Sequence, residues 1–129
     1  MSYGVQLFRK ETKELAEAAG NVGAFLESRK GLKAFTGGQI LSLRTRLTMV
    51  GFKKTKGGLG LLSSKEYYRH ASLSADALLT KTGVYLSASG KEAIFEIQMW
   101  ASEWTAGGAY VKYDPQEGKW EDLSQATPG

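Results

Sequence analysis

The side chains that could do chemistry in this chain are mainly cations and aromatic rings, and many lie close together in the sequence. Ten of the 17 lysine and arginine residues fall between positions 29 and 69, where Glu66 is the one acidic residue. Clustered cations create a positive potential that attracts phosphate, an acidic protein surface or anionic lipid. The alternative is an ordinary solvated surface, neutralised by the half of the chain after residue 70, which has 4 basic and 8 acidic residues.

The cations predicted to contact an anionic partner lie in the middle third of the chain. Arg44 and Arg46 are two residues apart, roughly 7 Å on a strand, which suits successive phosphates, although pairing with Glu92 or Glu96 across a sheet is an equal alternative. The glycine-rich segment 54–60 could wrap an anion with its backbone amides, or form a loop whose lysines confer solubility. The candidate contact residues are Arg44, Arg46, Lys53, Lys54, Lys56, Lys65 and Arg69.

Aromatic side chains accompany these cations. Tyr67 and Tyr68 lie between Lys65 and Arg69, and two tryptophans follow at positions 100 and 104. Aromatic rings next to cations can stack on nucleic-acid bases, and tryptophan is also enriched at protein interfaces. A second small hydrophobic core is the alternative for the tryptophans. The predicted stacking or interface residues are Tyr67, Tyr68, Trp100 and Trp104.

The sequence offers little for catalysis or metal binding. The absence of cysteine excludes thiol nucleophiles, disulfides and zinc fingers, and a single histidine, His70, excludes a multi-histidine metal site. Asp76, Glu66 and Ser72 are near His70 in sequence, but a general base also needs an oriented partner. The glycines match neither a Walker loop nor a dinucleotide fingerprint. We therefore expect a non-enzymatic protein with no cofactor and no metal.

The elements that must position these residues are short. Residues 12–30 have apolar side chains at three- and four-residue steps, which predicts a helix, and glycines at 20 and 23 leave open a break into two helices. Residues 41–49 alternate apolar and polar side chains, which predicts a strand with Arg44 and Arg46 on its polar face. A helix built on Ile40, Leu43, Leu47 and Val50 is the alternative.

A second alternation, over residues 92–104, predicts another strand, with Trp100 and Trp104 on the same side as Glu96. Short strands are expected at 5–8 and 83–88, and a hairpin from 109–113 and 119–123 around the turn at 114–118. We expect a flexible basic loop over 51–60 and one helical turn over 74–80, whereas 61–72 fits either class.

These elements predict a single α+β domain over residues 1–123, in which an N-terminal helix packs on a mostly antiparallel sheet of about five strands, followed by a flexible tail at 124–129. No apolar run reaches the roughly 18 residues of a membrane span. The N-terminus lacks a secretory signal, and with the absence of cysteine this predicts a cytoplasmic or intracellularly assembled protein.

The resulting expectation is a small binding module whose basic face engages nucleic acid or an acidic protein surface. Two alternatives remain open. A basic half and an acidic half could join copies of the chain into a homo-oligomer, as in a scaffold or viral particle. The chain could also be an inhibitor that docks on another protein, with the acidic residues of 114–122 imitating phosphate.

Overall fold

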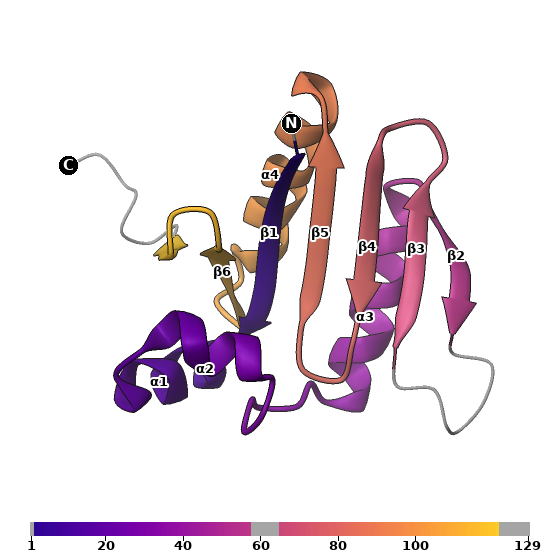
Figure 1. Ribbon diagram of the computed structural model, residues 1–129. Helices are drawn as coiled ribbons and strands as arrows, with labels where there is room; N and C mark the ends of the chain where they lie inside the picture. Colours follow the sequence, from indigo (N-terminus) through magenta and orange to yellow (C-terminus); the bar gives the residue numbers. More distant parts are fainter. Residues whose placement is uncertain (1, 58–64, 122–129) are drawn as a thin grey trace.

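Seven antiparallel strands and four helices make up the computed structural model over residues 2–57 and 65–121, the part of the chain that the structure describes (Figure 1). The order along the chain is β1 (Ser2–Arg9), α1 (Lys10–Ala19), α2 (Val22–Ser28), α3 (Gly37–Met49), β2 (Phe52–Gly57), β3 (Glu66–His70), β4 (Ala75–Leu79), β5 (Val84–Ser89), α4 (Lys91–Thr105), β6 (Tyr110–Asp114) and β7 (Lys119–Glu121). The predicted α+β class is thereby confirmed.

The strands form one sheet in the order β2-β3-β4-β5-β1-β6-β7. The N-terminal strand β1 lies inside the sheet, where it pairs with β5 on one side and β6 on the other. Because successive side chains on a strand point to opposite faces, Val5 and Leu7 face one side of the sheet, and Gln6 and Phe8 the other. The two faces are covered differently.

Helices α3 and α4 cover one face, behind the sheet in Figure 1. Leu43 and Leu47 of α3 and Ile97 of α4 are fully buried there, in a core that includes Val5 and Leu86 of the sheet. Burying a leucine or isoleucine side chain contributes about 1.5–3 kcal/mol. This core therefore fixes α3 and α4 against the strands.

Helices α1 and α2 pack on the opposite face, at the end formed by β1 and β6 (Figure 1). Their core contains Phe8, Ala16, Leu26, Leu32 and Tyr113. These two short helices do not reach the strands β2, β3 and β4, whose front face in the view carries no helix. The sheet therefore presents an open surface, called here the open face, over β2–β5.

Two predicted strands are wrong. Residues 41–49 belong to helix α3, and residues 92–104 belong to helix α4. In α3 the side chain of Thr36 caps the amide of Gln39, and the Gln39 side chain accepts from the amide of Thr36, which starts the helix. The helical alternative for this segment is the one that the structure contains.

Of the other elements predicted from the sequence, some are present and others are not. The predicted helix over 12–30 is two helices, separated at Gly20, where φ is +92°, with Asn21 capping α2. Residues 75–79 form a strand rather than a helical turn, and 52–57 form a strand rather than a loop. The strands expected at 5–8 and 83–88 and the hairpin of β6 and β7 are present. The proposed tail and residues 58–64 of the basic loop lie outside the described residues.

In residues 2–57 and 65–121, no helix has both the length and the apolar character needed to cross a bilayer.

Candidate binding surface

The open face carries two rows of side chains that run across the strands. The register aligns Tyr67 of β3 with Leu78 of β4, Tyr85 of β5 and Gln6 of β1. A neighbouring row aligns Lys53, Arg69, Asp76, Ser87 and Gly4. The first row is largely aromatic and apolar and the second is polar, so the surface offers both stacking and charge.

These rows line a shallow hollow of about 900 Å³. The small residues Gly4 and Ser87 line the floor of this hollow, and Tyr67 and Arg69 line its side at β3. A second, smaller hollow between α2 and the sheet shares Gln6 and Tyr85 with the first. The two hollows are therefore neighbours that meet at Gln6 and Tyr85.

Arginine at the end of α2 extends the surface. The Arg29 guanidinium lies 4.5 Å from the centre of the Tyr85 ring, in a cation–π contact. Arg29 adopts a left-handed conformation with φ of 55°, at the position that ends α2. Cations consequently lie at both ends of the aromatic row, with Lys53 and Arg69 near Tyr67 and Arg29 over Tyr85.

Neither Arg29 nor Tyr85 was among the sequence candidates, although one signal was available for the tyrosine. Tyr85 and Ser87 alternate with the apolar Val84 and Leu86 in a predicted strand, so they had to share the face away from that core. Arg29 carries no such signal, because its position depends on where α2 packs.

The other side of β2 and β3 holds a second group of cations, gathered around Glu66. Glu66 has an 8% exposed side chain, which accepts two hydrogen bonds from Nε of Arg44, at 3.0 and 3.1 Å, and one from the Tyr68 hydroxyl, at 2.7 Å. The Lys54 ammonium is 3.6 Å away. Arg44 and Lys54 thus share one carboxylate, which leaves this cluster with a net positive charge.

The environment of Glu66 stabilises its charged form. Burial alone would raise the pKa of Glu66, but hydrogen bonds from Arg44 and Tyr68 and the charges of Arg44 and Lys54 outweigh it, so the pKa is lowered. Burial, together with the hydrogen bond to Glu66, raises the pKa of Tyr68. The cluster is therefore a fixed set of charges at neutral pH.

The remaining candidate cations are divided between locations. Arg69 donates to Asp76 at 3.0 Å in an exposed ion pair on the open face. Lys53 is exposed there, opposite Arg69, and Lys65 is exposed just before β3. Arg46 lines a groove between α3 and α4 instead. Lys56 is in β2, and its backbone pairs with Tyr67.

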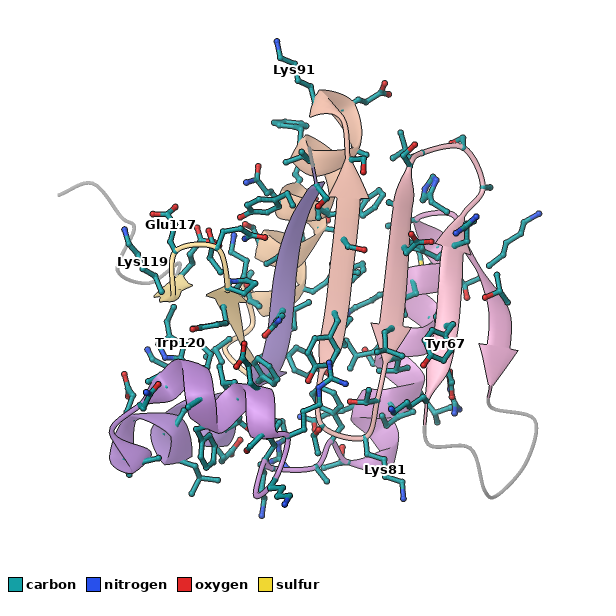
Figure 2. The ribbon with its side chains drawn as sticks, viewed as in Figure 1. Tyr67, Lys81, Lys91, Glu117, Lys119 and Trp120 are labelled. Carbon is teal, nitrogen blue, oxygen red and sulfur yellow. The ribbon has the colours of Figure 1, made fainter. Side chains whose placement is uncertain are left out.

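The four candidate aromatic residues are not brought together. Tyr67 is 41% exposed on the open face (Figure 2), whereas Tyr68 is buried on the other side of the same strand. Trp100 and Trp104 are buried in the core under α4, so the expectation that they lie on a polar strand face is wrong. The small-core alternative describes them better, although they belong to the main core.

His70 is held by the backbone. Its Nε2 is 2.7 Å from the carbonyl oxygen of Val50, and its Nδ1 accepts hydrogen bonds from the amides of Ser72 and Leu73. This pattern assigns the proton to Nε2, which donates to Val50. The ring also stacks on Trp100, with ring centres 5.6 Å apart. These contacts give His70 a structural role in joining β3 to α3 and α4.

One of the acidic residues at the β6–β7 turn, Asp114, points into the protein. Asp114 is buried and accepts hydrogen bonds from the Tyr3 hydroxyl and from the amides of Gln116 and Glu117. A phosphate-imitating surface over 114–122 would therefore lack Asp114. Within residues 2–57 and 65–121, no group of three or more histidine, cysteine, aspartate or glutamate side chains is placed to hold a metal ion.

No protein-family model matches this sequence, and no curated protein is similar enough to count as a relative.

Proposed function

We propose that the protein is a small non-enzymatic binding module that engages nucleic acid through the strands β2 and β3. The observation that carries the proposal is a net positive charge at this edge of the sheet. Lys53 and Arg69 lie on the open face and Arg44 and Lys54 on the other face, and Glu66 and Asp76 offset only part of their charge. A net positive surface of this kind attracts phosphates without selecting a base sequence.

Strand β2 also has to avoid pairing with other chains, because it is an edge of the sheet. Lysine at positions 53, 54 and 56 and an irregularity between Lys54 and Lys56 both discourage such pairing. This second role explains why lysines occur on the strand, but it does not require Arg44 and Arg69 on neighbouring elements. Their presence favours binding over edge protection alone.

The test is the salt dependence of binding to a fluorescein-labelled oligonucleotide of mixed sequence, measured by anisotropy. We expect affinity to fall steeply between about 50 and 200 mM salt. The double variant Lys53→Ala/Lys54→Ala should bind more weakly, with a smaller salt slope. The matched control is Lys91→Ala/Lys119→Ala, which removes the same charge from the start of α4 and from β7, both distant from Tyr67 in Figure 2. Equal weakening by both double variants, or no binding at low salt, contradicts the proposal.

Assembly into a homo-oligomer is the second candidate, because the outer sides of α3 and α4 expose apolar residues. Leu41 and Met49 are 62% and 79% exposed on α3, and Phe95 and Met99 are 61% and 40% exposed on α4. Exposed apolar patches often mark protein contacts. Light scattering after size-exclusion chromatography tests this function. An oligomer that Phe95→Glu converts to a monomer supports it, and a monomer at micromolar concentration contradicts it.

A further inference from the structure

The open face also carries a row of aromatic and apolar side chains, which a surface that binds through charge alone does not require. Tyr67 is a large aromatic ring that lies 41% exposed on a sheet, in a position that packs against no helix. Leu78 and Tyr85 continue the row across β4 and β5, and the hollow that they line adjoins a second hollow beside α2. Phosphate binding would need neither the row nor the hollow.

From this geometry we infer that the ligand is a single-stranded nucleic acid whose bases lie along the row of Tyr67, Leu78 and Tyr85. The inference rests on the proposed function and specifies its substrate class. The faces of unpaired bases are free to stack on aromatic rings, whereas in a duplex they are covered by neighbouring base pairs. Tyr67 and Tyr85 are two strand spacings apart, roughly 10 Å, with Leu78 between them. This length accommodates the two or three bases that an open sheet typically stacks.

The cations at the ends of the row fit a backbone that follows it. Lys53 and Arg69 lie in the neighbouring row beside Tyr67, and Arg29 lies over Tyr85. A strand that crosses the open face from β3 to α2 therefore meets positive charge where it enters and where it leaves. Because the Arg29 guanidinium covers the Tyr85 ring, the base at this end stacks on the guanidinium plane rather than on the ring, while the remaining N–H groups of Arg29 bind a phosphate.

The polar row offers hydrogen bonds to base edges along the same path. Asp76 accepts a hydrogen bond from Arg69 on one carboxylate oxygen, Oδ1, and Ser87 is next to Asp76 on β5. Gln6, on β1, is at the end of the neighbouring row. Ser87 has a small side chain and leaves room for a base on the floor of the hollow, whereas the backbone of Gly4 is already hydrogen-bonded by the Gln116 side chain. In the proposed complex these polar side chains would lie beside the bases, so they can form hydrogen bonds to the edges of unpaired bases.

The experiment compares a fluorescein-labelled oligouridine of about ten nucleotides with a mixed-sequence duplex of the same length, at low salt. We expect the single strand to bind more tightly. Tyr67→Leu should weaken single-strand binding about 5- to 150-fold and leave duplex binding unchanged. Tyr67→Phe should retain single-strand binding, because the stacking ring remains. The matched control is Phe95→Leu, which removes an exposed ring from α4 on the opposite side of the molecule.

Photocrosslinking keeps the inference testable even if the Tyr67→Leu variant does not fold. Irradiation of the unmodified protein with 5-iodouridine oligonucleotides, followed by peptide mass spectrometry, should give an adduct at Tyr67 or Tyr85. Equal affinity for both oligonucleotides, with no effect of Tyr67→Leu, would overturn the inference and leave the basic surface as proposed. Adducts confined to other residues would also overturn it. Absence of binding to either oligonucleotide would overturn the proposed function as well.

Discussion

Replacement of Glu66 by glutamine tests the cluster that joins α3 to β2 and β3. Glutamine has the shape of glutamate but no charge, and its amide would place a donor near Arg44 or Lys54, which are also donors. Removal of one partner of a buried ion pair costs about 3–5 kcal/mol. The Arg44 side chain is 41% exposed and can be rehydrated, so we expect a smaller loss, of about 2 kcal/mol. For a chain of this length, that corresponds to a fall in Tm of about 7 °C.

Urea denaturation followed by tryptophan fluorescence measures this loss, because Trp100 and Trp104 are buried in the core. The control is Asp76→Asn, which also neutralises a carboxylate but in an exposed pair with Arg69, where we expect a change below about 1 kcal/mol. Equal free energies of unfolding for the two variants would refute the reasoning that burial makes Glu66 the more important carboxylate.

The pH dependence provides a second readout for the same variant. Because the pKa of Glu66 is lowered from its usual 4.5, the charged carboxylate stabilises the native state above that pH, and the contribution is lost as the pH falls through the native pKa. The difference in stability between wild type and Glu66→Gln should therefore be complete at pH 7 and shrink in acid. A difference that stays constant below pH 4.5 would contradict this account of the ion pair.

Three further results are expected. Gly51→Ala should lower the free energy of unfolding by at least about 1–2 kcal/mol in urea titrations, because Gly51 has φ of +107° and an added Cβ would lie 2.7 Å from Nε2 of His70; an unchanged midpoint would contradict it. Thr36→Ala should destabilise α3 by about 1 kcal/mol, measured by thermal circular dichroism, whereas Thr36→Ser should not. Stability should also fall as the pH rises above 10, because burial raises the pKa of four tyrosines, Tyr3, Tyr68, Tyr85 and Tyr110, and the neutral form is the one that fits the fold. Absorbance at 295 nm after a pH jump should show that these rings ionise together with unfolding rather than before it.

Both wrong strand predictions, over 41–49 and 92–104, have the same cause. Alternation over 41–49 placed Leu41, Leu43, Leu47 and Met49 on one face, but only Leu43 and Leu47 are buried, at a helical spacing of four. Because Leu41 and Met49 are apolar although they are exposed, the segment appeared to alternate with the two-residue period of a strand. The signal that identifies the helix is local, because Thr36 and Gln39 form a capping box that can be read directly from the sequence.

For α4, the buried set is Ala93, Ile97, Trp100, Ala101 and Trp104, which is a helical pattern. Phe95 and Met99 are exposed apolar residues that imitated a strand. The class of the fold was nevertheless predictable, because the hairpin of β6 and β7 and the strands β1 and β5 follow clear local patterns.

The candidate site was only partly predictable for a different reason. The cations and Tyr67 could be selected by type, but their distribution between the two faces of the sheet depends on register and on which helix packs where. Glu66 illustrates this point, because its pairing with Arg44 joins a helix to a strand 22 positions later. No periodicity in the sequence specifies such a contact.

The internal position of β1 affects how the chain can fold as it is synthesised. Ser2 pairs with Ser89, and Gln6 pairs with Tyr113, so β1 cannot be paired on either side until β5 or β6 has been synthesised. Contacts between such distant positions slow folding, because a large loop must close before they form. The hairpins of β2–β5 connect neighbours in sequence and can assemble earlier. We therefore expect the nascent N-terminal strand to wait, unpaired, for a partly formed sheet into which it inserts.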